Sequence, residues 1–229
     1  MKQIHDKEGA RKRILSTCVR LFIEQGYSRT TPRQILEEAK VSPSSFYNIF
    51  PSKSSVLSVL CEFMFENQFE IAKAVVGEEA SGPLLYGAET AIQLTLAEMN
   101  ENLREIYVLV YTEPALLDMV QHRTAEELPK FFSTYLPGEQ ESGFYELEIG
   151  TSSIMRGYMA RPCDESFPLE RKLERFLRMC LQAYSVPEDE IRKIIDTVLQ
   201  LDIRGIASRV MYGLFAALEM RFDFKLDEQ

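Results

Sequence analysis

The sequence predicts an all-α fold, in which an N-terminal three-helix head is joined to a larger helical domain. Apolar residues recur at helical spacing in almost every segment, and no stretch shows strand alternation or a hairpin signal. Two pairs, Thr31-Pro32 and Ser42-Pro43, mark closely spaced helix starts. The clearest break is GEEASGP at 77–83. We therefore expect a head at 1–53, a connecting helix at 54–76 and a helical domain at 83–229.

The first helix is expected from about Gly9 to Gln25, and Gly26 is placed to end it as a C-terminal cap. Its apolar stripe consists of Ile14, Cys18, Leu21 and Phe22. The basic run at 11–13 fits a phosphate contact and a solvated helix face equally well.

Two capped helices around a tight turn come next. Thr31 caps the first helix with its hydroxyl, and Pro32 occupies the position where a missing N–H costs nothing. Lys40 and Val41 form the turn, with Val41 as a buried plug, and Ser42-Pro43 opens a second helix that ends near position 50. This arrangement is a helix-turn-helix, whose second helix can enter a DNA major groove.

These residues resemble the DNA-binding segment of the TetR family of one-component transcriptional regulators. The matching positions are Gly26, Tyr27, Thr30, Thr31, Ile35, Ala39, Val41, Ser42, Phe46, Tyr47, Phe50, Ser52, Lys53 and Leu57. The chain departs from the pattern at Leu36, where the family prefers Ala, at Lys40, where it prefers Gly, and at Ile49, where it usually has a ring. A turn glycine allows a positive φ, so Lys40 is expected to be strained there. The resemblance is specific over about residues 10–60.

The N-terminal residues of a recognition helix read base edges. This places Ser44, Ser45 and Asn48 toward the bases, with Pro43 against a thymine methyl group or a sugar. Tyr47 resembles the family's phosphate-binding tyrosine. Because serine and asparagine offer modest base discrimination, we expect DNA shape to contribute much of the specificity.

A third helix begins after the recognition helix, with Ser52 as its cap. Lys53 in its first turn combines an ammonium group with free backbone N–H groups, which predicts a phosphate clamp. Thr31 and Arg33 are placed to hold the opposite strand.

The charge distribution supports a DNA-binding head. The chain of 229 residues has a net charge of −9. Residues 1–60 hold ten basic and five acidic side chains, a net charge of +5, whereas the remainder holds 16 and 30, a net charge of −14. Such asymmetry indicates one basic face on an acidic body. Without the helix-turn-helix, a chance basic end would explain it as well.

The remainder of the chain is predicted to be helical throughout, at 84–99, 103–112, 114–135 with an interruption near Pro129, 144–160, 168–184 and 187–221. The last helix carries a surface of small residues: Gly205, Ala207, Ser208, Gly213, Ala216 and Ala217. In the TetR family the final helices pair across a dimer interface. The partner stripe would here be Leu169, Leu173, Phe176, Leu177, Cys180 and Leu181. The alternative is that these surfaces pack within one chain.

Aromatic and methionine residues of the larger domain are candidates for lining a ligand cavity, although such stripes also form ordinary cores. They are Met99, Tyr107, Tyr111, Phe131, Tyr135, Met155 and Tyr158. Glu148 and Thr151 share the face of the 144–160 helix that bears apolar residues. A buried carboxylate is costly unless it is paired. Glu148 is therefore expected to meet a cationic ligand or a protein arginine, and we favour the internal partner.

Enzyme, metal and membrane classes find little support. The chain has two histidines, and it shows no phosphate-binding glycine motif, nucleophile elbow or metal-ligand spacing among its four cysteines, so we expect no cofactor and no metal. Cys163 lies in the loop RPCDESFP, where a redox role is an alternative to an inert thiol. The longest apolar run, Ile106–Tyr111, is too short for a membrane span, and the N-terminus lacks a signal core, which predicts a cytoplasmic protein.

Together with the resemblance, these observations imply a homodimeric, ligand-responsive transcriptional regulator. It is expected to act as a repressor that binds a pseudo-palindromic operator in double-stranded DNA and is released by a small-molecule inducer. The alternatives are an architectural DNA-binding protein without a ligand and a helical enzyme. A solid core in the larger domain would favour the architectural alternative.

Overall fold

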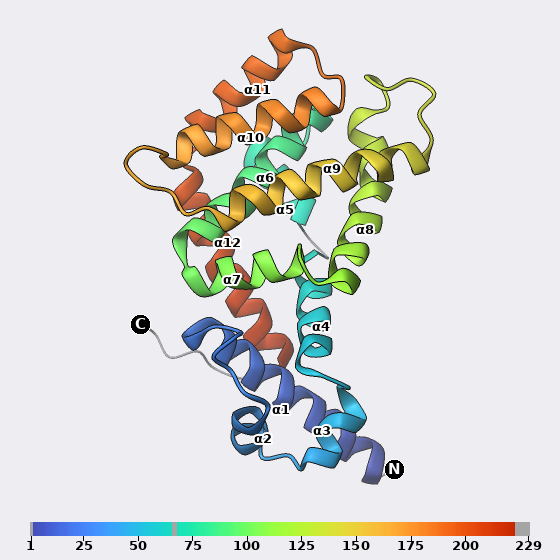
Figure 1. The fold of residues 1–229 in the computed structure, drawn as a ribbon, viewed down its shortest axis with the longest axis vertical. Coiled ribbons are helices and arrows are strands. Elements are labelled where there is room, and N and C mark those ends of the chain that lie inside the picture. Colours follow the sequence, from blue (N-terminus) through green and yellow to red (C-terminus); the bar gives the residue numbers. More distant parts are fainter. Residues whose placement is uncertain (1, 66–67, 223–229) are drawn as a thin grey trace. The chain divides into compact units, whose positions relative to one another are not determined.

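The computed structural model describes the backbone of residues 2–65 and 68–222, and the side chains of residues 7–62, 69–213 and 216. Within these ranges the chain forms twelve helices and no strand, which confirms the predicted all-α class (Figure 1). It divides into two compact units, the N-terminal unit (Met1–Glu66 with Val210–Gln229) and the larger unit (Asn67–Arg209). No described helix is both long and apolar enough to cross a membrane.

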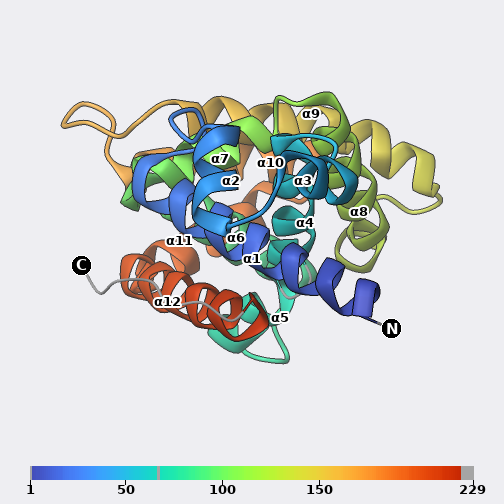
Figure 2. The ribbon, with the colours of Figure 1, turned by 90° about the horizontal axis from the view of Figure 1, so that it is seen from below.

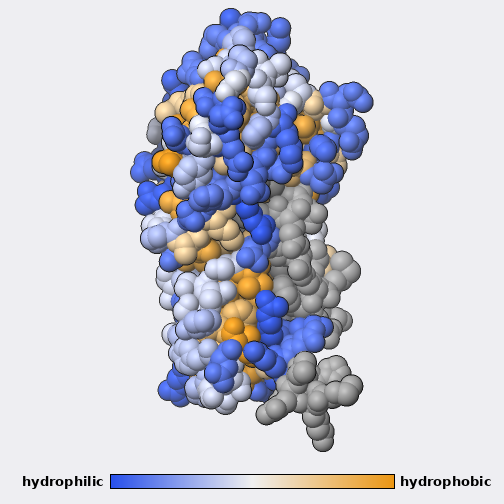
Figure 3. All heavy atoms as spheres, turned by 90° about the vertical axis from the view of Figure 1, so that its right-hand side faces the viewer, coloured by the Kyte–Doolittle hydropathy of each residue, from blue (hydrophilic) through white to orange (hydrophobic). Residues whose placement is uncertain are grey.

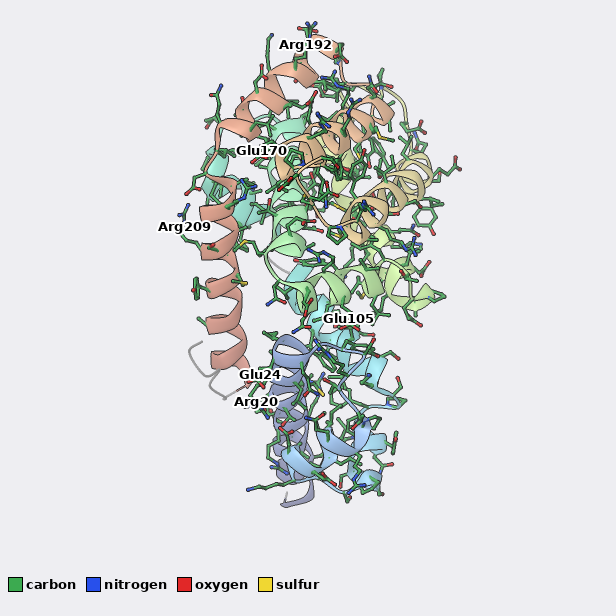
Figure 4. All side chains as sticks on the ribbon, turned by 60° about the vertical axis from the view of Figure 1, so that its left-hand side comes forward. Arg20, Glu24, Glu105, Glu170, Arg192 and Arg209 are labelled. Carbon is green, nitrogen blue, oxygen red and sulfur yellow. The ribbon has the colours of Figure 1, made fainter. Side chains whose placement is uncertain are left out.

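The N-terminal unit is built on α1 (Lys2–Gln25), α2 (Pro32–Ala39), α3 (Pro43–Ile49) and α4 (Lys53–Phe65). The short α2 and α3 both pack on α1, as Figure 2 shows from below. Its fully buried side chains include Ile14, Cys18, Phe22, Ile35, Phe46, Val56 and Leu57. On the surface of α1, Arg20 and Glu24 lie one turn apart and form an ion pair of 3.0 Å (Figure 4). The α1 helix begins earlier than the predicted Gly9.

Three side-chain caps set the helix starts of this unit, as predicted. The Thr31 hydroxyl accepts a hydrogen bond from the Gln34 N–H at 3.2 Å. The Ser42 hydroxyl accepts one from the Ser45 N–H at 3.1 Å. The Ser52 hydroxyl accepts one from the Ser55 N–H at 3.2 Å. Each cap satisfies a backbone donor that the first turn of a helix leaves without an intrahelical partner.

The turn between α2 and α3 places Lys40 in the left-handed region, with φ 52° and ψ 49°. Its N–H and that of Val41 both bond to the Leu36 carbonyl, which ends α2 in the usual left-handed manner. A side chain at this position is strained, because its Cβ approaches the following carbonyl. Val41 is only half-buried, so the prediction of a fully buried plug is wrong.

Replacing Lys40 with glycine is expected to stabilise the protein. A non-glycine residue in the left-handed region is strained by roughly 1–2 kcal/mol. Glycine relieves this strain, but part of the gain is lost because glycine has more conformational freedom in the unfolded chain. We expect Lys40→Gly to raise the free energy of unfolding by about 1 kcal/mol, measured by urea denaturation. The control, Lys40→Ala, keeps a Cβ and should bring no such gain. Equal stability of the two variants would contradict this explanation.

The larger unit is organised around one central helix. Its helices are α5 (Gln68–Val76), α6 (Gly82–Met99), α7 (Glu101–Val110), α8 (Pro114–Phe132), α9 (Glu141–Ala160), α10 (Leu169–Ala183), α11 (Glu188–Gln200) and the start of α12 (Ile203–Phe222). α6 packs against α5, α7, α8, α9, α10 and α11. At its start, a Cβ on Gly82 would lie 2.5 Å from the Phe131 Cα, so the backbones of α6 and α8 approach closely there.

Two of the predicted helices differ in continuity from the observed ones. The helix expected at 54–76 includes residues 66–67, which lie outside the description, and its described parts are α4 and α5. α8 continues through Pro129, and the buried neighbours Leu128, Phe131 and Phe132 hold its last turn. The helix expected at 187–221 is two helices, because the Asp202 carboxylate accepts a hydrogen bond from the Gly205 N–H at 3.1 Å and starts α12 afresh.

The predicted partner stripe on α10 does not face outward. Each of its six residues is at most 4% exposed within a single chain, so the stripe is core and cannot pair with a second copy. Of the small residues on α12, Ala207 is buried, Gly213 and Ala216 are exposed, and the Ala217 side chain lies outside the description. The visible surface of the larger unit is mostly hydrophilic, with scattered apolar residues (Figure 3).

Candidate functional site

The residues predicted to meet DNA, apart from Lys53 on α4, lie on α2 and α3 or at their starts. Thr31, Arg33, Pro43, Ser44, Ser45 and Asn48 are exposed, and Tyr47 is 52% exposed although it is a large aromatic residue. The Tyr47 ring packs edge-on against buried Phe46, with ring centroids 5.2 Å apart. Its hydroxyl end is therefore held at the surface of α3 by a contact with the core.

The polar side chains of α3 differ in whether they form hydrogen bonds. The Ser45 hydroxyl accepts a hydrogen bond from the Ser42 hydroxyl at 2.9 Å. Within the described residues, the side chains of Ser44 and Asn48 make no hydrogen bond, so their donors and acceptors point to solvent. Arg33 forms an exposed ion pair with Glu37 at 2.8 Å on α2. Exposed pairs of this kind are weak, so the guanidinium can exchange its partner for a phosphate.

The ammonium of Lys53, the predicted phosphate clamp, has acceptors inside the N-terminal unit. Its ammonium donates hydrogen bonds to the carbonyls of Tyr27 and Thr30, each at 2.8 Å. It also lies 3.9 Å from the centroid of the Tyr27 ring, a cation–π contact. Because the Thr30 carbonyl immediately precedes the Thr31 cap, Lys53 fixes the loop from which α2 starts.

Two residues of the basic run near the start of α1 also contact other parts of the N-terminal unit. The Arg13 side chain donates a hydrogen bond to the Ala39 carbonyl at 3.1 Å, which satisfies a carbonyl at the end of α2. The Arg11 guanidinium lies 5.9 Å from the centroid of the Phe50 ring. Both side chains therefore join α1 to the helix-turn-helix, and neither is a simple solvated charge.

A small cavity of about 20 Å³ lies inside the larger unit and continues into open solvent. It has room for about one water molecule. It is bounded by α5, α6, α8, α9 and the end of α7. Its lining residues are Phe69, Tyr86, Glu89, Thr90, Gln93, Tyr111, Thr124, Glu148, Thr151, Ser152 and Met155. Both aromatic rings and carboxyl groups are among them.

Four of the predicted ligand residues line this cavity, namely Tyr111, Glu148, Thr151 and Met155. The other five, Met99, Tyr107, Phe131, Tyr135 and Tyr158, are not among its lining residues. Met99 is 38% exposed, and the Tyr135 hydroxyl donates to the Glu190 carboxylate at 2.6 Å. Sequence reasoning missed Glu89, although it is the one charged residue between positions 82 and 97.

Glu148 finds internal partners, but neither is an arginine. Its Oε2 accepts hydrogen bonds from the Thr151 hydroxyl at 2.8 Å and the Tyr184 hydroxyl at 3.2 Å. Glu89 accepts a hydrogen bond from the Gln93 amide, and Gln93 in turn accepts one from the Tyr111 hydroxyl at 3.4 Å. The two carboxyl groups are 4% and 5% exposed, respectively. The hydrogen-bond donors to both carboxyl groups are therefore neutral.

Burial raises the pKa of both cavity carboxyls from 4.5 to about 7. The main cause in each case is the loss of hydration of the charged form. The Gln93 amide opposes this rise at Glu89, and the Thr151 and Tyr184 hydroxyls oppose it at Glu148. The charge of Glu89 raises the pKa of Glu148 further, so the two groups titrate as a pair.

Cys163 lies beside a buried ion pair. The ammonium of Lys172, which is fully buried, binds Glu98 Oε1, and the Cys163 N–H donates to Glu98 Oε2 at 2.9 Å. Burial raises the pKa of the Cys163 thiol, which opposes the thiolate that a redox sensor needs. Among the residues whose positions are described, no group of three or more His, Cys, Asp or Glu side chains could hold a metal ion.

The raised pKa values make stability depend on pH. The folded protein binds protons between the ordinary value of 4.5 and about 7, so the stabilising contribution is complete below pH 4.5 and is lost as the pH rises through about 7. A rise of this size corresponds to on the order of 3 kcal/mol per carboxyl. We expect Glu148→Gln to reduce the loss of unfolding free energy between about pH 5 and pH 8, measured by urea denaturation.

The matched control for this measurement is Glu146→Gln, which removes an exposed carboxyl from the same helix. It should follow the wild-type pH profile. If Glu148→Gln and Glu146→Gln show the same profile, burial of Glu148 is not the source of the pH dependence.

Comparisons with known proteins agree with this geometry. Residues 14–60 match the family model described as "Bacterial regulatory proteins, tetR family". The chain is 27% identical over 135 residues to the uncharacterized HTH-type transcriptional regulator YvkB of Bacillus subtilis, covering 58% of this chain and 68% of that protein. It is 20% identical over 212 residues to the HTH-type transcriptional regulator AcrR of Shigella flexneri, covering 93% and 83%, respectively.

A solved structure has the same fold. The crystal structure of RolR in complex with resorcinol superposes with a TM-score of 0.63 at 16% sequence identity, covering 84% of this chain and 95% of RolR. Because the match extends over both units, it places the larger unit as well as the helix-turn-helix within a known architecture.

Proposed function

We propose that this chain, which belongs to the TetR family of transcriptional regulators, is a repressor that binds an operator as a homodimer and is released by a small molecule. The observation that carries the DNA-binding part is α3, a capped helix whose polar side chains point outward. The observation that carries the ligand-responsive part is the cavity of the larger unit.

Two kinds of contact are assigned to the DNA-binding surface. Ser44, Ser45 and Asn48 read base edges, because they lie in the exposed part of the recognition helix. Tyr47 and Arg33 contact phosphates and set the position of the helix. Lys53 acts indirectly, since it holds the loop before α2.

Dimerisation would place two such helices on half-sites about one helical turn apart, in a pseudo-palindromic operator. Exposed Gly213 and Ala216 keep the end of α12 accessible to a second helix in a single chain. Among the described residues, a Cβ added at Gly213 would meet no atom within 4 Å. A bulky residue there should therefore interfere with a partner copy and leave the fold of the monomer intact.

The polar and aromatic lining of the cavity, which continues into open solvent, supports a ligand-responsive regulator. RolR, which shares the fold, was solved with resorcinol bound. We propose that a small molecule enters the cavity of this chain and shifts the protein toward a state with low operator affinity. Such a shift requires that the molecule bind the two states with different affinities.

Substitutions at Asn48 and Arg33 should separate base reading from phosphate contact. Operator duplexes are first selected from a random library, and binding is then titrated at several salt concentrations. Asn48→Ala should cost about 1–3 kcal/mol on the operator and leave the salt slope unchanged. Arg33→Ala should weaken operator and non-operator binding about equally and reduce the salt slope by about 1.

The control is Lys193→Ala, which removes an exposed cation from α11 of the larger unit. It should change neither affinity nor salt slope. If the wild-type protein shows no salt-dependent binding to any duplex, the proposal of a DNA-binding regulator fails.

A further inference from the structure

One peptide unit in the turn between α2 and α3 is held from both sides. It joins Ala39, the last residue of α2, to Lys40. Its N–H donates to the Leu36 carbonyl, and its carbonyl oxygen accepts a hydrogen bond from the Arg13 Nε at 3.1 Å. Arg13 lies on α1, against which both short helices pack (Figure 2). The orientation of this peptide plane is therefore fixed by α2 on one side and by α1 on the other.

The same peptide unit leads into the strained residue of the turn. Lys40 has φ 52°, a conformation that is unfavourable for a residue with a side chain. Because φ is the rotation between the Ala39–Lys40 peptide plane and the Lys40 Cα, a bond that holds the plane opposes relaxation of the turn. Ser42 caps α3 only two residues later. The direction in which α3 leaves the turn thus depends on the angle at Lys40.

The three cations of the basic run on α1 differ in what they contact. Arg13 reaches the end of α2, and the Arg11 guanidinium lies 5.9 Å from the centroid of the Phe50 ring, at the residue that ends α3. A cation is favourable at the C-terminal end of a helix, where carbonyls lack intrahelical partners. Lys12 is exposed, and within the described residues no hydrogen bond or ion pair holds its ammonium. Lys12 is therefore a matched control for Arg13.

We propose that Arg13 is a positioning residue for operator recognition, which holds the Ala39–Lys40 peptide and thereby aims α3 at the bases. This inference rests on the proposed function, because α3 must read DNA for its direction to matter. The alternative is that the Arg13 guanidinium neutralises a phosphate. The two roles lead to different losses when Arg13 is replaced.

Base reading and phosphate contact respond differently to a change in the direction of α3. Hydrogen bonds to base edges require side chains that are held to within about 0.5 Å of the productive geometry. Binding to non-operator DNA depends mainly on charge and tolerates such a change. Loss of a positioning residue should therefore weaken operator binding selectively. Loss of a phosphate contact should weaken binding to both kinds of DNA about equally and reduce the salt slope by about 1.

The test titrates the full chain with a selected operator duplex and a non-operator duplex of the same length, at several salt concentrations. Arg13→Gln and Lys12→Gln each remove one cation from the same run. We expect Arg13→Gln to lower the ratio of operator to non-operator affinity about tenfold and to keep the salt slope of the wild-type protein. Lys12→Gln should leave the ratio unchanged, because any phosphate contact of Lys12 is shared by both duplexes.

A second substitution tests the route through the turn. Glycine adopts the left-handed conformation without strain, so Lys40→Gly should let the turn keep its angle without help from Arg13. In the presence of Lys40→Gly, adding Arg13→Gln should change the affinity ratio by much less than tenfold and leave the salt slope unchanged. Circular dichroism checks that each variant is folded. If Arg13→Gln alone does not fold, the comparison of Lys40→Gly with the double variant still separates the two roles by their salt slopes.

Three results would overturn the inference. They are an affinity ratio that Arg13→Gln leaves unchanged, a reduction of the salt slope by about 1 with equal losses on both duplexes, and a loss of preference that is as large in the presence of Lys40→Gly. Each of them, obtained while the wild-type protein binds duplex DNA, leaves the proposed regulator standing. If the wild-type protein binds no duplex in a salt-dependent manner, both proposals fail.

Discussion

The burial of α6 on every side is the constraint on which the larger unit depends. Six other helices surround it, and fourteen of its residues are buried. A helix in this position cannot turn its polar side chains to water, so each must find a partner inside the protein. Thr90 and Thr95 bond to carbonyls of their own helix, and Gln93 links Tyr111 to Glu89. Among the described residues, the Glu89 carboxyl accepts this one hydrogen bond, and Glu148 from α9 lines the same cavity.

The N-terminal unit could be predicted closely because its signals are local. Each helix start depends on one hydroxyl and one or two neighbouring residues, as at Thr31-Pro32 and Ser42-Pro43. Even the strain at Lys40 follows from its place in the turn, where φ is positive. The internal partners of Lys53 were not predicted, for the opposite reason. Its partners, the carbonyls of Tyr27 and Thr30, lie more than twenty residues away in the chain, and no local pattern announces them.

The cavity was predicted less well, because it depends on which helices meet. Periodicity placed Glu148, Thr151 and Met155 on one face of α9, and these residues do line the cavity. The same reasoning predicted a helix at 84–99 and named none of its polar residues as a cavity candidate. A helix that is buried all round carries its polar residues inward as well, which is how Glu89 and Gln93 escaped notice. The α10 stripe was assigned to a dimer interface because amphipathicity does not distinguish a partner from a neighbouring helix.

Two carboxyl groups are buried together without a cation among the described residues, and carboxyl titration by NMR tests this arrangement most directly. The protein is labelled with ¹³C at the glutamate side-chain carboxyl carbon, and the signals of Glu89 and Glu148 are assigned from their glutamine variants. We expect these two signals to titrate near pH 7, well above the ordinary 4.5, in the protein without ligand. Titration of both signals near 4.5 would contradict the account, because it would mean that water or a protein cation already stabilises their charge.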